Sequence, residues 1–117
     1  MNISVIRGDT NKFIFYRKDK NGNVIKSQPN AVYFSVKTNG FEKNVIFQKK
    51  LSDMTFDSET GKYTFYILPT DTNNLEYGVY EYDIEIKDII DEVAYTKTIA
   101  MGVFEIKKEI TFASNEV

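Results

Sequence analysis

The side chains that could do chemistry in this sequence are carboxylates, lysines and tyrosines, because the chain has no histidine and no cysteine. This composition excludes His-based catalytic triads, imidazole and thiolate metal sites, thiol nucleophiles and disulfides. The best-spaced acids are Asp83 and Glu85, which share the outward face of a predicted strand, where solvated charges belong. No feature near them indicates a desolvated cleft that would shift a catalytic pKa. We therefore expect no enzymatic activity and no cofactor.

One run of oxygen-bearing side chains is similar to the start of a calcium-binding loop. Residues 19–23 have the sequence Asp-Lys-Asn-Gly-Asn. A complete loop that starts at Asp19 needs glycine at its sixth position and a bidentate acid at its twelfth, whereas Val24 and Asn30 stand there. The stronger prediction is a hairpin turn, with calcium binding left open by the clustered oxygens.

The tripeptide Arg7-Gly8-Asp9 matches a sequence that binds integrin receptors when it is exposed at a loop tip. Three residues carry little specificity. Gly8 and Asp9 also make an ordinary turn between two predicted strands, which is the interpretation we favour.

A candidate interaction surface consists of four tyrosines: Tyr16, Tyr33, Tyr66 and Tyr95. The first three fall on strand faces opposite the predicted core faces, whereas Tyr95 shares a side with Val93 and Ile99. Exposed tyrosine is enriched in protein interfaces and also stacks on sugar rings. The alternative is that all four pack on or between the sheets.

Alternation of apolar and polar residues is the main structural signal, because neighbouring side chains of a strand point to opposite faces. In residues 79–87, Tyr80, Tyr82, Ile84 and Ile86 alternate with charged residues. A helix would wrap those charges around its whole surface and bury some of them at a cost. The same pattern predicts inward side chains in other strands: Phe13, Phe15, Val32, Phe34, Val36, Tyr63, Phe65, Ile67, Phe104 and Ile106.

The sequence predicts strands over residues 3–6, 11–18, 31–38, 43–51, 63–68, 79–87, 93–100 and 101–108, the last continuing through Ile110 and Phe112. Turn-forming residues separate them at 19–23, 38–40, 57–61 and 88–91. A single helical turn is predicted in residues 69–75, capped by Thr70 or Asp71. Short strands with frequent turns are typical of a β-sandwich.

Length and charge limit the partners. The chain has 117 residues, which suits one domain, and we assign it to residues 1–112, followed by a polar tail at 113–117. With 15 basic and 17 acidic residues the net charge is -2, so the broad positive field that nucleic acid requires is lacking. No stretch has the roughly 20 apolar residues needed to span a membrane. We expect neither nucleic acid nor membrane as a partner, and synthesis in the cytoplasm.

Three stretches together resemble a known group of domains: residues 7–23, residues 31–37 (Ala-Val-Tyr-Phe-Ser-Val-Lys) and residues 75–86 (Leu-Glu-Tyr-Gly-Val-Tyr-Glu-Tyr-Asp-Ile-Glu-Ile). They are similar to the small immunoglobulin-like domains of tail, baseplate and head-associated proteins of phages and prophages of Gram-positive bacteria, including the N-terminal domain of baseplate upper proteins. Residues 98–106 and 109–111 fit the last strand of that pattern. The resemblance implies an all-β, immunoglobulin-like antiparallel β-sandwich of about 7–9 strands.

The resemblance also implies a noncatalytic structural protein of the virion, made in the cytoplasm of the bacterial host. Its partners would be other virion proteins and further copies of itself. Since residues 1–117 extend little beyond the predicted sandwich, we expect no fibre or receptor-binding region, and the expected role is that of an adaptor, connector or decoration subunit. The alternative is a carbohydrate-binding module, which requires Tyr33, Tyr66 and Tyr95 on one flat exposed face.

Overall fold

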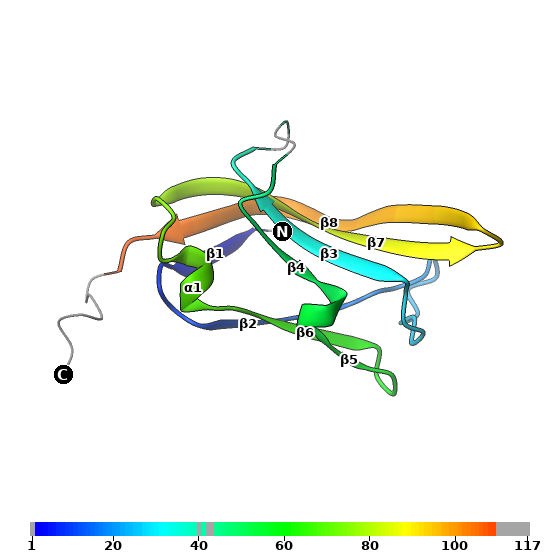
Figure 1. Cartoon of the computed structure of the whole chain (residues 1–117). Helices are drawn as coiled ribbons and strands as arrows, with labels where there is room; N and C mark the ends of the chain where they lie inside the picture. Colours follow the sequence, from blue (N-terminus) through cyan, green and yellow to red (C-terminus); the bar gives the residue numbers. More distant parts are fainter. Residues whose placement is uncertain (1, 40, 42–43, 110–117) are drawn as a thin grey trace.

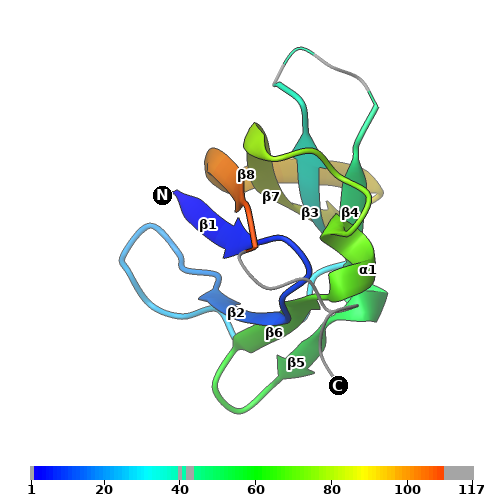
Figure 2. The same ribbon diagram turned by 90° about the vertical axis from the view of Figure 1, so that its left-hand side faces the viewer.

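The computed structural model describes residues 2–39, 41 and 44–109, and within them the chain is mostly β structure. Eight described strands form two sheets: a mixed, curled half-barrel with the order β1-β8-β7-β3-β4, and a smaller sheet with the order β2-β6-β5. Figure 1 labels these strands, and Figure 2 shows the larger sheet curving over the smaller one. The strands are β1 (Ile3–Ile6), β2 (Asn11–Tyr16), β3 (Ala31–Lys37), β4 (Phe47–Lys50), β5 (Thr55–Asp57), β6 (Lys62–Ile67), β7 (Gly78–Ile90) and β8 (Val93–Lys107). The prediction of an all-β fold is confirmed at this level.

The core lies between the two sheets and consists mainly of the alternate residues that the sequence predicted, but Val5 was not among them and Phe13 and Phe15 are only partly buried. Phe34 of β3 meets Phe65 of β6 with ring centroids 4.9 Å apart, and this pair joins the sheets at their centre. Phe15 stacks on Tyr63 within the small sheet at 4.6 Å. Large aromatic rings at this separation fill the interior with dispersion contacts. Because only every second side chain of a strand reaches this interior, apolar and polar residues alternate along the strands. The fully or almost fully buried apolar residues are Val5, Val32, Phe34, Val36, Tyr63, Phe65, Ile67, Tyr82, Ile84, Ile86, Phe104 and Ile106.

The prediction of a purely antiparallel sheet is wrong at one edge. β1 pairs with β8 in parallel, with Ile3 opposite Phe104 and Ile6 opposite Lys107. Residue alternation sets which face of a strand is buried, but it is the same for both strand directions. The direction of β1 therefore could not follow from its pattern.

The strands predicted at 93–100 and 101–108 are one continuous strand, β8. Its alternation changes phase because Ala100 lies opposite Ile84 whereas Thr98 lies opposite Glu85, which leaves Ile99 as an extra residue. Such a β-bulge shifts every preceding side chain to the other face. The sequence signal for two separate strands was in fact the signal of this bulge.

The turn predicted at 88–91 lies further along the chain. β7 continues to Ile90, which pairs with Val93, so the loop consists of Asp91 and Glu92 alone. Both residues have positive φ, 51° and 66°, as a two-residue type I′ hairpin requires. Neither residue is asparagine or glycine, the usual residues of such a turn, and for that reason the sequence indicated a turn in this region but not its exact position.

Other boundaries also differ. β2 ends at Tyr16, before the predicted limit, and the strand predicted at 43–51 is shortened to β4 with a 3₁₀ helix at Leu51–Asp53. Asp53 Oδ2 accepts the N–H of Lys50 at 2.9 Å, which turns the chain out of β4. β5 was not predicted. Gly40, Lys43 at the start of the strand predicted at 43–51, the extension through Ile110 and Phe112, and the tail at 113–117 lie outside the described residues.

The predicted helical turn is present as α1 (Pro69–Thr72), but its cap is different. Leu68 is the N-cap, and Asp71 accepts the N–H of Leu68 at 2.7 Å. Asp71 also pairs with Lys49 of β4 at 2.7 Å. The buried hydroxyl of Thr72 accepts the N–H of Gly8 at 2.9 Å. These contacts tie α1 to β4 and to the turn after β1, which lie at the two edges of the larger sheet.

Candidate interaction site

The hairpin formed by the ends of β7 and β8 extends beyond the rest of the molecule (Figure 1). We call residues 88–97 the hairpin arm. Four large apolar side chains near its tip are about half exposed: Ile89 (53%), Ile90 (55%), Val93 (51%) and Tyr95 (56%). Apolar side chains grouped on a projecting element are typical of a protein interface. Ile89 and Ile90 were not predicted as interaction residues, although the run Ile-Ile-Asp-Glu-Val at 89–93 was a signal for them.

One edge of the arm has no neighbouring strand in the part of the chain that the structure describes. β1 covers β8 only from Phe104 to Lys107, and Asn2 Oδ1 accepts the N–H of Val103 at 3.2 Å. From Val93 to Ala100 no described strand pairs with β8 on this side. We call this stretch the open edge. An unpaired edge offers backbone hydrogen-bonding groups to another strand.

Contacts of Asn30 fix which backbone groups face the open edge. Asn30 donates its N–H to Lys87 O at 2.9 Å and accepts the N–H of Ile89 at 2.8 Å. These groups of Lys87 and Ile89 therefore point away from β8, and their cross-strand partners Thr96 and Ala94 point away from β7. The N–H and C=O groups of Ala94 and Thr96 face the open edge.

The same alternation applies to Thr98, which lies opposite Glu85. By contrast, Tyr95 and Lys97 direct their backbone groups to β7. The open edge thus presents three evenly spaced pairs of backbone donors and acceptors.

An apolar groove of about 300 Å³ lies between the two sheets, bordered by β1, β2 and Ala100 at the end of the open edge. Its lining includes core aromatic rings and small side chains: Ile3, Phe13, Phe15, Phe34, Phe65 and Ala100. Figure 2 shows β1 and β8 facing β2 on this side of the molecule. The groove brings core side chains within reach of any segment that pairs with β8 near Ala100.

A partly buried ion pair holds the base of the arm against the small sheet. Arg17 donates to Asp88 Oδ2 at 2.7 Å and to the carbonyl of Ser27 at 2.8 Å. Only 8% of Arg17 is exposed. The hydroxyl of Tyr63 is buried beside Arg17, and burial raises the pKa of Tyr63. The ion pair therefore anchors the arm at its base.

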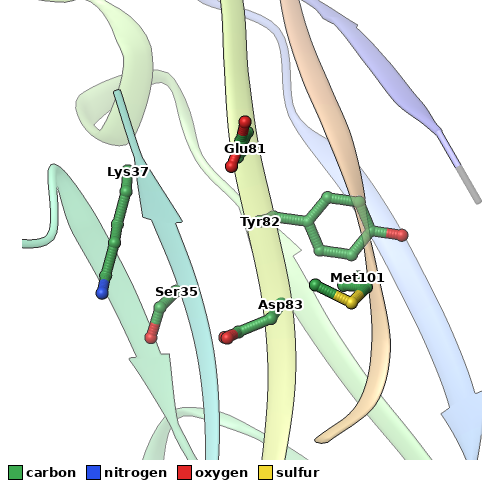
Figure 3. Close-up of a pocket in the computed structure, with 6 residues that line it drawn as sticks. All are labelled: Ser35, Lys37, Glu81, Tyr82, Asp83 and Met101. Carbon is green, nitrogen blue, oxygen red and sulfur yellow. The ribbon is translucent and has the colours of Figure 1, made fainter. Parts of the chain in front are cut away.

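The outer face of the larger sheet carries Asp83 and Glu85, the two acids considered above as catalytic candidates, with Glu85 opposite Tyr33 of β3. Figure 3 shows Ser35 and Lys37 of β3 beside Glu81 and Asp83 of β7, around a shallow hollow of about 120 Å³ that Tyr82 and Met101 complete. Lys37 lies opposite Glu81, and Ser35 lies opposite Asp83. Acids and bases that alternate across strands stabilise a solvated sheet face.

The four candidate tyrosines do not share a surface. Tyr33 lies half-buried on the outer face of the larger sheet, whereas Tyr16 and Tyr66 are exposed on the outer face of the small sheet. Tyr95 is exposed on the arm. The bulge at Ile99 puts it on the inward side of β8, beyond the small sheet. The flat face that sugar binding by Tyr33, Tyr66 and Tyr95 would need is not formed.

Arg7 of the Arg7-Gly8-Asp9 tripeptide is held by other residues. It donates to Glu109 Oε1 at 2.8 Å and to the hydroxyl of Tyr77 at 2.7 Å, and its guanidinium lies 4.2 Å from the centre of the Tyr77 ring. The hydrogen bond from Arg7 and the one from Tyr77 lower the pKa of Glu109. Since Arg7 is committed to this cluster, the tripeptide is not displayed as a free receptor motif.

The predicted hairpin turn at 19–23 is confirmed. Asp19 Oδ1 accepts the N–H groups of Asn21 and Asn23 at 2.9 and 3.0 Å, and the chain closes with a bond from Asp19 N to Asn23 O. This Asx turn uses the Asp19 carboxylate to fix the backbone.

Within residues 2–39, 41 and 44–109, no group of three or more acidic side chains has an arrangement that could hold a metal ion. No helix in the same residues is long and apolar enough to cross a membrane. The sequence matches no protein-family description and no curated protein.

Proposed function

We propose that this chain is a noncatalytic structural module that works by association with other proteins through strand edges and sheet faces. The observation that carries the proposal is the hairpin arm, which combines four half-exposed apolar side chains with an open strand edge. Strand addition to such an edge gives affinity through backbone hydrogen bonds and needs no pocket.

The finer fold in this proposal is an immunoglobulin-like sandwich. The stretches that resemble phage and prophage domains correspond to β2 with the turn that follows it, to β3, and to β7. Two packed sheets with a central aromatic core are compatible with that architecture. The parallel pairing of β1 with β8 is an additional feature that such a sandwich must accommodate.

The proposed setting is a virion of a phage or prophage, assembled from protein made in the bacterial cytoplasm. The role is that of an adaptor, connector or decoration subunit in the tail, baseplate or head. In such particles a subunit is present in many copies, and a weak edge contact that is repeated gains strength from multivalency. Further copies of the chain and neighbouring virion proteins are the partners proposed.

Sedimentation of the purified chain over a range of concentrations tests the proposal, together with binding to the purified products of neighbouring genes. The expected result is self-association that increases with concentration, or a stable complex with at least one neighbour. A chain that remains monomeric at the highest concentration and binds none of these products would contradict it.

A further inference from the structure

We infer that two copies of this chain join through their open edges, with β8 of one copy antiparallel to β8 of the other about a two-fold axis at Thr96. This inference rests on the proposed function and specifies its partner as a second copy of the chain. It follows from the direction of the backbone groups, from the side-chain pairs that the symmetry creates, and from the length of the open edge.

The backbone supports this register. Thr96 lies on the axis, so its N–H donates to the C=O of the partner's Thr96 and its C=O accepts the N–H of the partner's Thr96. Ala94 then lies opposite the partner's Thr98, and Thr98 opposite the partner's Ala94. All three residues direct their backbone groups to the open edge, so every hydrogen-bonded position of the new ladder has a donor and an acceptor.

The side chains on the inward face are self-complementary in this register. Tyr95 lies opposite the partner's Lys97, in a position that is not hydrogen-bonded and brings side chains closest. A lysine beside a tyrosine ring gains a cation–π attraction. A two-fold axis at Lys97 would instead place two lysines opposite each other, which is repulsive.

A second inward pair is apolar, because Val93 lies opposite the partner's Ile99. Val93 is half exposed in the single chain, and Ile99 packs at the margin of the core. Next to Ile99, Ala100 lines the apolar groove between the sheets. The partner's Val93 therefore covers the end of that groove.

The open edge is long enough to pair with the β8 part of the partner's arm. In this register the partner's turn, Asp91 and Glu92, ends opposite Met101 and Ala100. Val103, two residues beyond Met101, already donates its N–H to Asn2 Oδ1. The partner's strand thus ends before it would meet the start of β1, and the two bodies lie at opposite ends of the shared ladder.

Disulfide trapping tests this arrangement, because the natural chain has no cysteine and any bond formed by a single-cysteine variant joins two copies. In Thr96→Cys the two cysteines would be directly opposite, with Cα atoms about 5.5 Å apart, which is within the range of a disulfide. In the matched control Thr98→Cys they would be four residue steps apart, roughly 14 Å, which is too far. Both positions are exposed in the single chain.

The expected result is a covalent dimer of Thr96→Cys on mild oxidation and little dimer of Thr98→Cys. A mixture of Ala94→Cys and Thr98→Cys should form the mixed dimer in preference to either homodimer. Equal trapping of all variants, or preferential trapping of Thr98→Cys, would overturn the two-fold at Thr96.

Trapping and sedimentation separate the two proposals. If the natural chain associates but Thr96→Cys does not become cross-linked, the inferred dimer is wrong and the proposed function stands on another surface. If the natural chain neither associates nor binds the products of neighbouring genes, the proposed function itself fails.

Discussion

Arg17 and Asp88 form an ion pair of 2.7 Å that joins the end of the small sheet to the base of the hairpin arm. Arg17 is almost fully buried, whereas about a third of the Asp88 side chain is exposed. Across the strand pair Asp88 lies opposite Tyr95. The contact therefore fixes the position from which the arm extends.

Replacing Arg17 with methionine should destabilise the fold by about 2 kcal/mol, because Asp88 loses its cation and the carbonyl of Ser27 loses its donor. Urea unfolding of Arg17→Met measures this loss. Lys12→Met, on the exposed face of β2, is the control and should change the free energy of unfolding by less than about 0.5 kcal/mol. Equal stabilities of the two variants would show that the ion pair has no structural role.

Two turns require glycine for different reasons: Gly22 because of its backbone conformation alone, and Gly61 because of its conformation and a close approach of neighbouring atoms. Both have positive φ, 77° and 85°. A Cβ at Gly61 would lie 2.6 Å from Val24 Cγ1 and 2.9 Å from the carbonyl oxygen of Ile25, whereas a Cβ at Gly22 would meet nothing within 4 Å.

Gly22→Ala should therefore cost only the conformational penalty, about 1 kcal/mol, and Gly61→Ala should cost clearly more. Thermal unfolding of both variants gives the difference. A loss at Gly22 as large as that at Gly61 would mean that the close approach to Val24 and Ile25 carries no energy.

The cluster of Arg7, Tyr77 and Glu109 predicts a dependence on pH. The pKa of Glu109 is lowered in the folded chain, so its charged form contributes stability at neutral pH that is lost as pH falls from about 5 through the folded pKa. A carboxyl titration by NMR should place Glu109 below its ordinary value of about 4.3. Arg7→Gln should raise that pKa, and Glu109→Gln should reduce the acid sensitivity of stability. An unchanged Glu109 pKa in Arg7→Gln would contradict this assignment.

The two-residue turn at the tip of the arm should be open to improvement. Asp91 and Glu92 both have positive φ, where asparagine and glycine are favoured. The double variant Asp91→Asn and Glu92→Gly should stabilise the hairpin by about 1 kcal/mol. Urea unfolding followed by backbone NMR signals of the arm measures this effect, and a loss of stability would contradict the type I′ assignment.

Much of the fold could be predicted from the sequence, because burial on one face imposes alternation. Phe34, Phe65 and Ile84 show this, since each was placed inward by pattern and each is buried. Long-range relationships were not accessible in the same way. The parallel pairing of Ile3 with Phe104 depends on where the chain returns after nearly the whole fold, which no local pattern records.

The candidate site was harder to predict than the core. The tyrosines were identified by their residue type, and the structure distributes them over different surfaces. The open edge depends instead on which residues have no neighbour, a property of the assembled sheet. Thr96 is unremarkable in the sequence and acquires its position only from the pairing of β8 with β7.

Amide hydrogen exchange in dilute and concentrated samples tests most directly whether the open edge carries association. Amides that face β7, such as those of Tyr95 and Lys97, should be protected in both samples because their bonds lie within the chain. The amides of Ala94, Thr96 and Thr98 should exchange quickly in the dilute sample and become protected in the concentrated one. If these three amides exchange at the same rate in both samples while the chain is shown to associate, the contact lies elsewhere and the role given to β8 is wrong.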